Sequence, residues 1–378
     1  MALSYAIRSG QKQLRCGYTT GTCAALAAAG AAFWLLTGQK PADLSLMTPK
    51  GIPVQVEPAC LRREGEAAVC GVRKDGGDDI DATHGLIIEA HVEKSERPGV
   101  FIEGGRGVGR VTKPGLDQPV GAAAINRVPR QMIEKEVTKV QKNCGYMGGL
   151  SVTIVIPGGE EAAKKTFNPH LGIEGGLSVL GTSGIVEPMS EQALIDTIEV
   201  EIRQAAASGH DALILTPGHY GELFLQQDAC SLTEKRPVVK CSNFIGDALD
   251  LAALYKFRQV LLVGHMGKLV KLAGGIMNTH SRYADGRMEL ICAHAAVCGA
   301  SQDICQALMQ AATTDACLEL LESTGLRDAV LKSLLMAIDR HLSRRAQGAF
   351  QVGAILFSNV YGLLGETEQA KEIITSWQ

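Results

Sequence analysis

The spacing of apolar residues divides the chain into two regions. Over residues 1–160, short stretches that alternate in polarity or run apolar for a few positions predict strands at 67–73, 86–92 and 150–156. The stretch 125–140 places its apolar residues on one face of a helix. Short strands with few helices are typical of an α+β fold. We therefore expect residues 1–160 to form an α+β domain with a mainly antiparallel sheet.

A different pattern begins near Leu177. Apolar strands alternate with loops and helices in four units, written LSVLGTSG, ALILTPGHYG, VVKCSNFIGDALDLAALYKF and QVLLVGHMGKLVKLAGG. This alternation is typical of a parallel sheet with helices on both faces, and it predicts an α/β domain over residues 170–345. Residues 349–365 predict a strand, a turn and a strand, which we expect to return to the first domain.

Ligands of such a sheet bind at the carboxyl ends of its strands. Four loops are expected to meet there, at Gly181–Ile185, Thr216–Gly221, Ser242–Gly246 and Gly264–Lys268. The last is similar to a P-loop but lacks its glycine spacing, and Leu269 stands where Mg²⁺ coordination needs Ser or Thr. The first is not a G-x-G-x-x-G fingerprint. These departures argue against an ATPase and an NAD dehydrogenase, and they leave a cofactor cleft of unstated type.

Near the start of the chain, the stretch Leu14–Leu26 reads LRCGYTTGTCAAL and leads into an alanine-rich run. Alanine favours helix and threonine favours the N-cap position, so a Gly/Thr loop opens a helix here. Unpaired N–H groups in the first turn make such a loop a candidate site for phosphate or carboxylate. The alternative is a capped helix whose alanines pack tightly against a sheet.

Two further loops carry charge. Residues 74–85, KDGGDDIDATHG, place four aspartates among glycines; they could bind a cation, cap a helix, hold basic partners or form a solvated turn. Their spacing is not that of an EF-hand loop. Residues 101–121 carry Arg106, Arg110 and Lys113 in a Gly/Pro-rich stretch, which could bind carboxylates or form an ordinary basic hairpin.

Composition narrows the classes of function. The 378 residues carry a net charge of -3 and only 4% aromatic residues, so we expect neither a general attraction to nucleic acid or anionic membranes nor a base-stacking platform. The longest apolar run, Ala24–Leu36, is too short to span a bilayer. Eleven cysteines without a C-x-x-C pair are typical of a reduced cytoplasmic protein. No protein-bound metal is predicted.

Six motifs, taken in order, resemble one family. GYTTGTCA, KDGGDDIDATHG, GGRGVGRVTKPGL, GTSGIVEPMS, TPGHYG and GHMGKLVKLAGGIMNTHS together resemble the cobalt-precorrin-5B C1-methyltransferases of the anaerobic cobalamin pathway. The match runs over nearly the whole chain. The resemblance implies an N-terminal α+β domain that binds the corrinoid and a Rossmann-like α/β domain that binds S-adenosylmethionine.

The reaction that the resemblance implies is transfer of a methyl group from S-adenosylmethionine to C1 of cobalt-precorrin-5B, giving cobalt-precorrin-6A. The sulfonium is already an activated donor, so in-line placement at the ring carbon is the main catalytic task. A proton must leave, and His219 and His265 are the candidates for acid/base work or corrin contact. The alternative for each is a loop histidine that holds backbone geometry. Cobalt is expected only as part of the substrate.

The expected binding residues come from these loops and from the resemblance. For the cofactor they are Gly181, Thr182, Ser183, Gly184, Thr216, Gly218, Asn243, Gly264, Gly267 and Lys268. For the corrinoid and its acetate and propionate carboxylates they are Thr19, Thr20, Gly21, Thr22, Cys23, Asp78, Asp79, Arg106 and Lys113.

Other functions stay open at this point. A methyltransferase that acts on another tetrapyrrole carbon would carry the same motifs, because regiochemistry depends on how the ring lies over the sulfonium. A corrinoid- or nucleotide-binding protein without turnover is the alternative from another class. We expect a small-molecule substrate and no nucleic-acid or membrane partner. A homo-oligomer and transient contacts with neighbouring pathway enzymes are also left open.

Overall fold

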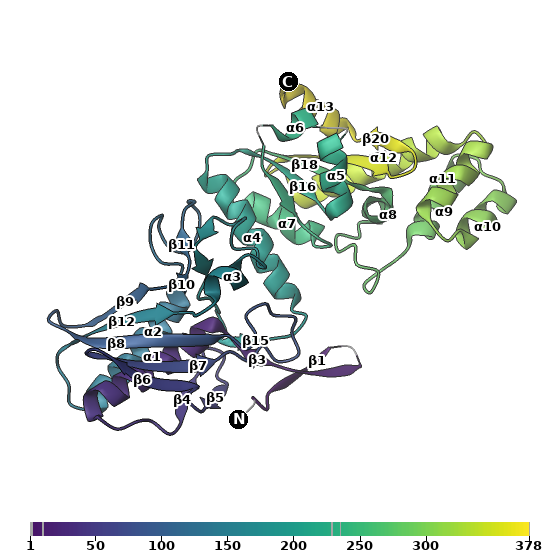
Figure 1. The fold of residues 1–378 in the computed structure, drawn as a ribbon. Coiled ribbons are helices and arrows are strands. Elements are labelled where there is room, and N and C mark those ends of the chain that lie inside the picture. The colour runs from purple at the N-terminus through teal and green to yellow at the C-terminus, as the bar shows by residue number, and fades with distance from the viewer. Residues whose placement is uncertain (1–2, 10, 228–229, 235, 378) are drawn as a thin grey trace. The chain divides into compact units, whose positions relative to one another are not determined.

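The computed structural model describes residues 3–9, 11–227, 230–234 and 236–377. Its chain forms two compact units, Met1–Glu191 and Gln192–Gln378 (Figure 1). The units are described separately below.

The first unit combines strands with three helices among the residues that the structure describes. Its elements are β1 (Ala6–Ser9), β2 (Lys12–Arg15), β3 (Gly17–Tyr18), α1 (Thr20–Thr37), β4 (Leu44–Met47), β5 (Pro53–Val56), β6 (Cys60–Glu64), β7 (Ala67–Arg73), β8 (Ile87–Ser95), β9 (Val100–Gly104), β10 (Gly107–Val108), β11 (Arg110–Val111), α2 (Arg127–Asn143), β12 (Gly149–Val155), α3 (Gly159–Ala163), β13 (Ile173–Glu174), β14 (Gly176–Leu177) and β15 (Ile185–Val186).

A five-stranded sheet organises this unit, in the order β6-β7-β8-β12-β9. Neighbouring strands are antiparallel except β12 and β9, which run parallel. Alternate residues such as Ile88, Ala90 and Val92 are fully buried against the helices, as the two-residue period of a strand requires. The predicted strands and the mainly antiparallel sheet of the first region are confirmed.

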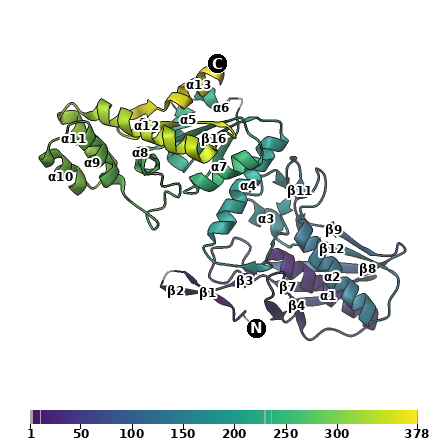
Figure 2. The same ribbon diagram turned by 180° about the vertical axis from the view of Figure 1, so that it is seen from behind.

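Helices α1 and α2 cover one face of that sheet (Figure 2). Small residues let α1 approach closely: a Cβ on Gly30 would lie 2.6 Å from a methyl of Leu44 and 2.9 Å from the sulfur of Cys70. The helix ends at Gly38, whose φ of 72° is the left-handed conformation that favours glycine. The helix has 18 residues and is longer than the apolar run Ala24–Leu36 that we judged too short for a bilayer, so its length and composition would suffice to cross a membrane. Yet 72% of its apolar window is buried within the structure. A helix buried against a sheet and a second helix is a core element.

The second unit holds the remaining elements. They are α4 (Glu191–Ala207), β16 (Ala212–Thr216), α5 (His219–Gln227), α6 (Cys230–Thr233), β17 (Val238–Lys240), α7 (Ile245–Leu254), β18 (Gln259–His265), α8 (Met266–Leu269), η1 (Val270–Gly274), α9 (Arg287–Val297), α10 (Gln302–Gln310), α11 (Thr314–Ser323), α12 (Arg327–Ala346), β19 (Gln351–Ser358), β20 (Gly362–Glu366) and α13 (Glu368–Trp377).

Its sheet has the order β17-β16-β18-β19-β20, with the first four strands parallel and β20 antiparallel to β19. One face, with Leu213, Leu215 and Leu262, packs on a core that includes α4, α7 and α12. The other, with Leu261 and Val263, packs on α5 and α13. The prediction of a parallel sheet with helices on both faces is confirmed.

Two expectations about the units are wrong. Residues 349–365 do form strands, but β19 pairs in parallel with β18, so they complete the second sheet and do not return to the first domain. The segment around Gly181 is not a strand–loop unit of that sheet, because β14 pairs with β10 and β15 with β3 inside the first unit. The boundary between units therefore lies at Glu191, later than the predicted 160–170.

Candidate functional site

The start of α1 is built from threonines whose side chains turn back onto the chain. Thr19 is the N-cap, and its Oγ1 accepts from the backbone N–H of Thr22 at 3.2 Å. The backbone N–H of Gly21, also in the first turn, donates to the carbonyl of Leu180 at 3.1 Å. Thr19 and Thr20 are only 5% and 4% exposed, and Cys23 is fully buried. These backbone N–H groups of the first turn are therefore bonded within the protein.

A single loop, residues 180–184, provides the partners. Thr22 Oγ1 donates to the carbonyl of Gly184 at 2.7 Å, and the N–H of Thr19 donates to the same oxygen at 3.1 Å. Thr20 Oγ1 donates to the carbonyl of Leu180 at 3.2 Å and accepts from its N–H at 3.0 Å. These contacts account for the position of Gly181, Thr182, Ser183 and Gly184. The loop follows β14 of the first unit and is bonded to α1, contrary to our expectation that it follows a strand of the parallel sheet.

Near this helix start, other atoms of the protein lie so close to two glycines that there is no room for a side chain. A Cβ on Gly17 would lie 2.2 Å from the carbonyl oxygen of Asp75, and one on Gly21 would lie 2.7 Å from Pro129 Cγ. Neither leaves space for a ligand beside the backbone. The geometry fits the alternative of a capped, tightly packed helix better than an open anion site.

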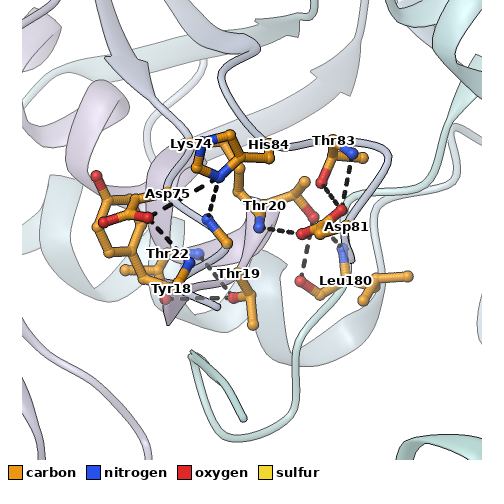
Figure 3. A network of polar contacts seen from close by, with 12 residues as sticks. Tyr18, Thr19, Thr20, Thr22, Lys74, Asp75, Asp81, Thr83, His84 and Leu180 are labelled. Carbon is orange, nitrogen blue, oxygen red and sulfur yellow. Dashed lines mark hydrogen bonds and ion pairs between the residues drawn. The ribbon is translucent and has the colours of Figure 1, made fainter. Parts of the chain in front are cut away.

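The acidic loop lies beside the same helix start (Figure 3). Lys74 is 2% exposed, and its Nζ contacts Asp81 Oδ2 at 2.5 Å. The other oxygen of Asp81 accepts from the N–H and hydroxyl of Thr83 at 2.7 and 2.5 Å. Burial raises the pKa of Asp81, but Lys74 and Thr83 outweigh it, so that pKa lies below its usual value. This buried ion pair stabilises the conformation of the loop, because both residues belong to it.

Other aspartates of the loop are also engaged within the unit. Asp75 accepts two bonds from the guanidinium of Arg15, at 2.5 and 3.0 Å, and this pairing lowers the pKa of Asp75. Asp78 accepts from the backbone N–H of Arg15 at 2.7 Å, and Asp79 accepts from that of Met189 at 3.3 Å. Of the four roles left open for this loop, holding basic partners is the one that the contacts fit.

The basic side chains of residues 101–121 are less completely paired than the aspartates of the acidic loop. Arg110 pairs with Glu103 at 2.8 Å, and Lys113 Nζ donates to the carbonyl of His170 at 3.1 Å. Arg106 is exposed, and its guanidinium has no partner within the described part of the chain. Among the candidate substrate residues of the first unit, Arg106 thus offers a guanidinium that is both exposed and unpaired to a carboxylate.

In the second unit, two loops meet at the carboxyl ends of β16 and β18. The chain moves outward from β16 to β17 on one side and later crosses to β18 on the other, so the strand order reverses between β16 and β18. Lys268, at the end of the second loop, donates through Nζ to the carbonyl of Pro217 in the first at 2.5 Å. Burial lowers the pKa of Lys268. This bond fixes the two loops against each other.

Glycines of these loops divide into two kinds. A Cβ on Gly221 would lie 1.8 Å from Thr216 Oγ1, and one on Gly264 would lie 2.9 Å from Leu269. Both glycines are required because a larger residue would clash with these neighbouring side chains. At Gly218 the nearest atom to a Cβ is Lys268 Nζ at 3.6 Å, so the backbone there is accessible. A ligand can approach the chain closely at Gly218.

The two candidate histidines differ in their surroundings. His219 is exposed, and its Nδ1 lies 3.2 Å from Glu222, which also pairs with Lys240 at 2.9 Å. His265 caps α8: its Nδ1 accepts from the N–H of Gly267 at 3.0 Å. Burial lowers the pKa of His265. With Nδ1 accepting, the neutral ring carries its proton on Nε2, so it faces a ligand as a hydrogen-bond donor and not as a base.

The remaining predicted cofactor residues lie in the same unit. Asn243 follows β17, and its Oδ1 accepts from the hydroxyl of Thr279 at 3.2 Å. Thr216 is fully buried, and its hydroxyl donates to the carbonyl of Gly218 at 3.1 Å. The structure thus brings Thr216, Gly218, Gly264, Gly267 and Lys268 together at one edge. Asn243 lies at the end of the outer strand β17, next to β16.

The sequence interpretation missed two residues of this edge. Ser358 is the last residue of β19, and its hydroxyl donates to Asp315 Oδ1 at 2.7 Å. Ser358 was hidden because its strand was assigned to the first domain. Asp315 lies in the first turn of α11, between segments that read only as helices, so no local signal distinguished it. Within the described residues, no group of three or more His, Cys, Asp or Glu could hold a metal ion.

Comparison with known proteins connects this geometry to a family. The CbiD family model matches residues 7–188, and the model of the CbiD C-terminal domain matches residues 278–368. Relatives named cobalt-precorrin-5B C(1)-methyltransferase include one from Ruminiclostridium cellulolyticum, 48% identical over 92% of this chain and 90% of its own length. Another, from Alkaliphilus metalliredigens, is 41% identical over 98% of this chain and 96% of its own length.

Among solved structures, a cobalamin biosynthesis protein (cbiD) from Archaeoglobus fulgidus is 29% identical to this chain. The match covers 75% of this chain and 87% of that one, with a TM-score of 0.40.

Proposed function

Because this chain belongs to the CbiD family of cobalt-precorrin-5B C(1)-methyltransferases, we propose that it methylates C1 of cobalt-precorrin-5B to give cobalt-precorrin-6A. The observation that carries the proposal is the agreement of relatives at 41–48% identity, each aligned over at least 85% of this chain, on one name. The methyl donor is S-adenosylmethionine, and the cobalt belongs to the substrate.

The second unit is the proposed cofactor domain, with a Rossmann-like arrangement of its parallel strands. In open α/β sheets, ligands bind outside the carboxyl ends of the strands where the strand order reverses. That point lies between β16 and β18, where Thr216, Gly218, Gly264, Gly267 and Lys268 gather. Gly218 offers accessible backbone there. Asn243, at the end of the next strand, extends the same edge.

The histidines of this edge take modest roles in the proposal. The sulfonium needs no activation, so placement of the methyl carbon in line with the ring carbon provides most of the rate enhancement. His265 offers an Nε2–H as a hydrogen-bond donor to cofactor or corrin. His219, exposed at the start of α5, contacts the same ligands. Neither has to act as the base for the methyl transfer itself.

In the first unit, we propose that the basic segment around Arg106 binds substrate carboxylates. The corrinoid carries several acetates and propionates, and an unpaired exposed guanidinium is suited to hold one in a bidentate bond. Lys113 is also exposed and contributes a second positive charge. The threonines of α1 and Asp78 and Asp79 are already bonded within the chain, so we give them a structural role.

We also propose that the protein works in the cytoplasm. The ten cysteines whose side chains the structure describes are free thiols. Free thiols persist in a reducing compartment.

The test of the proposal combines binding with turnover. Isothermal titration with S-adenosylmethionine and S-adenosylhomocysteine, with and without a cobalt-corrinoid, should give micromolar binding. Single-turnover mass spectrometry should then show the gain of one methyl group, and NMR of the product should place it on C1. Binding of both ligands without turnover would instead indicate a corrinoid-binding protein. A methyl group on another carbon would change the regiochemistry but keep the enzyme class.

A further inference from the structure

The carboxylate of Asp315 lies at the same edge as the proposed cofactor residues. Its Oδ1 accepts from the hydroxyl of Ser358, the last residue of β19, at 2.7 Å. The preceding residue, Thr314, is close to the loop after β18: its Oγ1 would lie 3.7 Å from a Cβ on Gly267. The start of α11 is therefore held against the carboxyl ends of two neighbouring parallel strands.

The contacts of Asp315 leave one oxygen unused. Ser358 Oγ accepts from the backbone N–H groups of Val360 and Tyr361 at 3.0 and 3.3 Å, so its own proton points to Asp315. Across the described residues, Oδ2 of Asp315 has no partner. The side chain is half-buried. A half-buried carboxylate that is fixed through one oxygen is a strong acceptor for a ligand hydroxyl or N–H at the other.

Flat rings surround this part of the edge. The ring of His265 meets Phe357 edge-on at 5.7 Å, and it lies 6.3 Å from the ring of Tyr220, which is 60% exposed. Phe357 is buried and packs against His265, so the rings open to a ligand here are those of Tyr220 and His265. Rings beside a well-placed polar group are typical of sites for a nucleoside, whose base packs on rings while its sugar forms directional hydrogen bonds.

We propose that Asp315 accepts hydrogen bonds from the ribose diol of S-adenosylmethionine. This inference rests on the proposed function and specifies a residue that orients its cofactor. The cofactor's α-ammonium is a poorer fit, because the α-carboxylate beside it would repel Asp315. The cations of this edge are already engaged: Lys268 with the carbonyl of Pro217, and Lys240 with Glu222. The uncharged diol brings two donors without a second negative charge.

The test compares Asp315→Asn with a matched control. Asp303 in α10 occupies the same position after an N-cap, Ser301, as Asp315 does after Thr313, but it is exposed, and its carboxylate has no hydrogen-bond or ion-pair partner among the described residues. Both substitutions remove one favourable charge from a helix start. In Asp315→Asn, the side-chain oxygen can still accept from the hydroxyl of Ser358. Isothermal titration should show S-adenosylhomocysteine binding about 10- to 100-fold more weakly to Asp315→Asn, and within about twofold of wild type to Asp303→Asn.

A second ligand separates the ribose from the amino-acid end. 5′-Methylthioadenosine keeps the ribose and lacks the ammonium, so it should lose as much affinity as S-adenosylhomocysteine in Asp315→Asn. Its 2′-deoxy and 3′-deoxy forms should bind wild type more weakly and bind the variant with little further loss. Ser358→Ala, which frees the carboxylate to rotate, should give a smaller loss in the same direction.

Several results would overturn the inference. Equal affinities of wild type and Asp315→Asn, or a loss confined to S-adenosylhomocysteine, would remove Asp315 from the ribose. A melting temperature of Asp315→Asn far below that of Asp303→Asn would make its lost binding uninformative; the deoxy analogues on wild type and Ser358→Ala would then decide the question. If wild type binds none of these ligands, the proposed function fails, and the outcome is distinct from a failure at Asp315.

Discussion

Two regions of this molecule have glycine-rich loops that lead from a strand into a helix, yet only the second region is open to a ligand. The loop before α1 is buried, and its donors bond to the segment 180–184. The loops after β16 and β18 present an accessible backbone at Gly218 and an exposed His219, and the start of α11 adds a carboxylate oxygen of Asp315 at the same edge. The loops of both regions are rich in glycine and small polar residues. They differ because, in the first region, a distant segment of the chain already bonds to the polar groups of the helix start.

The acidic loop 74–85, beside the closed start of α1, depends on buried charge, so the largest loss of stability is expected from breaking the ion pair between Lys74 and Asp81. Asp81→Asn leaves an ammonium that is 2% exposed without its counter-charge, which should lower the free energy of unfolding by about 3–5 kcal/mol. Urea unfolding measures this. The control is Asp79→Asn, which removes a charge from the same loop but only a 3.3 Å bond from Met189.

The pH dependence sharpens this prediction. The pKa of folded Asp81 is lowered, so its stabilisation is present above the pKa of the unfolded chain and is lost as the pH falls through the folded value. Wild type should therefore lose more stability than Asp81→Asn on acidification below about pH 4. Parallel curves for the two proteins would contradict the assigned role of the ion pair.

How far the sequence predicted this arrangement can be judged from particular residues. β16 and β18 were placed correctly because a buried strand followed by glycines is a local signal. The pairing of β19 was not, since the chain segment between β18 and β19 holds α9–α12 and hides their adjacency. The run Val352–Phe357 is buried throughout, as in a central strand covered on both faces. That apolar run was the available signal.

The threonines of α1 show the other limit. A Gly/Thr loop opening a helix was predicted here because threonine favours the N-cap position, and the structure shows such a cap at Thr19. That Leu180 and Gly184 would occupy the remaining donors lay beyond local reasoning, because these partners stand about 160 residues away in the chain. A helix start open to an anion and one closed by a distant loop have the same local sequence.

A second test replaces one glycine by alanine in each region, at the start of α1 and in the loop after β16. Gly17→Ala would put a methyl group 2.2 Å from a backbone carbonyl, and the resulting overpacking should lower the free energy of unfolding by about 1–3 kcal/mol. Gly218→Ala has space and lies outside the left-handed backbone region, so its melting temperature should match wild type. Its affinity for S-adenosylhomocysteine should fall, since the methyl group occupies space that we assign to the cofactor. Unchanged binding by Gly218→Ala would show that this loop does not contact the cofactor.

A third test addresses the bond that joins the two open loops. Lys268→Met keeps the unbranched stem of the side chain, one atom shorter, but removes its hydrogen bond to Pro217. We expect the Michaelis constant for S-adenosylmethionine to rise about tenfold, with a smaller change in melting temperature, because the loops lose their mutual position. Steady-state kinetics and thermal unfolding measure the two effects. A lowered melting temperature with an unchanged constant would make Lys268 a purely structural residue.

The smallest expected difference lies between two N-caps. Thr19 in α1 is 5% exposed, whereas Thr313 in α11 is exposed, and each accepts from the N–H three residues on. Thr313→Ala should lower the free energy of unfolding by about 0.5–1 kcal/mol, because water replaces the lost acceptor. Thr19→Ala should reach about 1–2 kcal/mol, because the N–H of Thr22 is left buried and unpaired. Denaturant midpoints of the two variants would separate these values. Equal losses would mean that water reaches the start of α1, and the contrast between a closed and an open loop would then have to be abandoned.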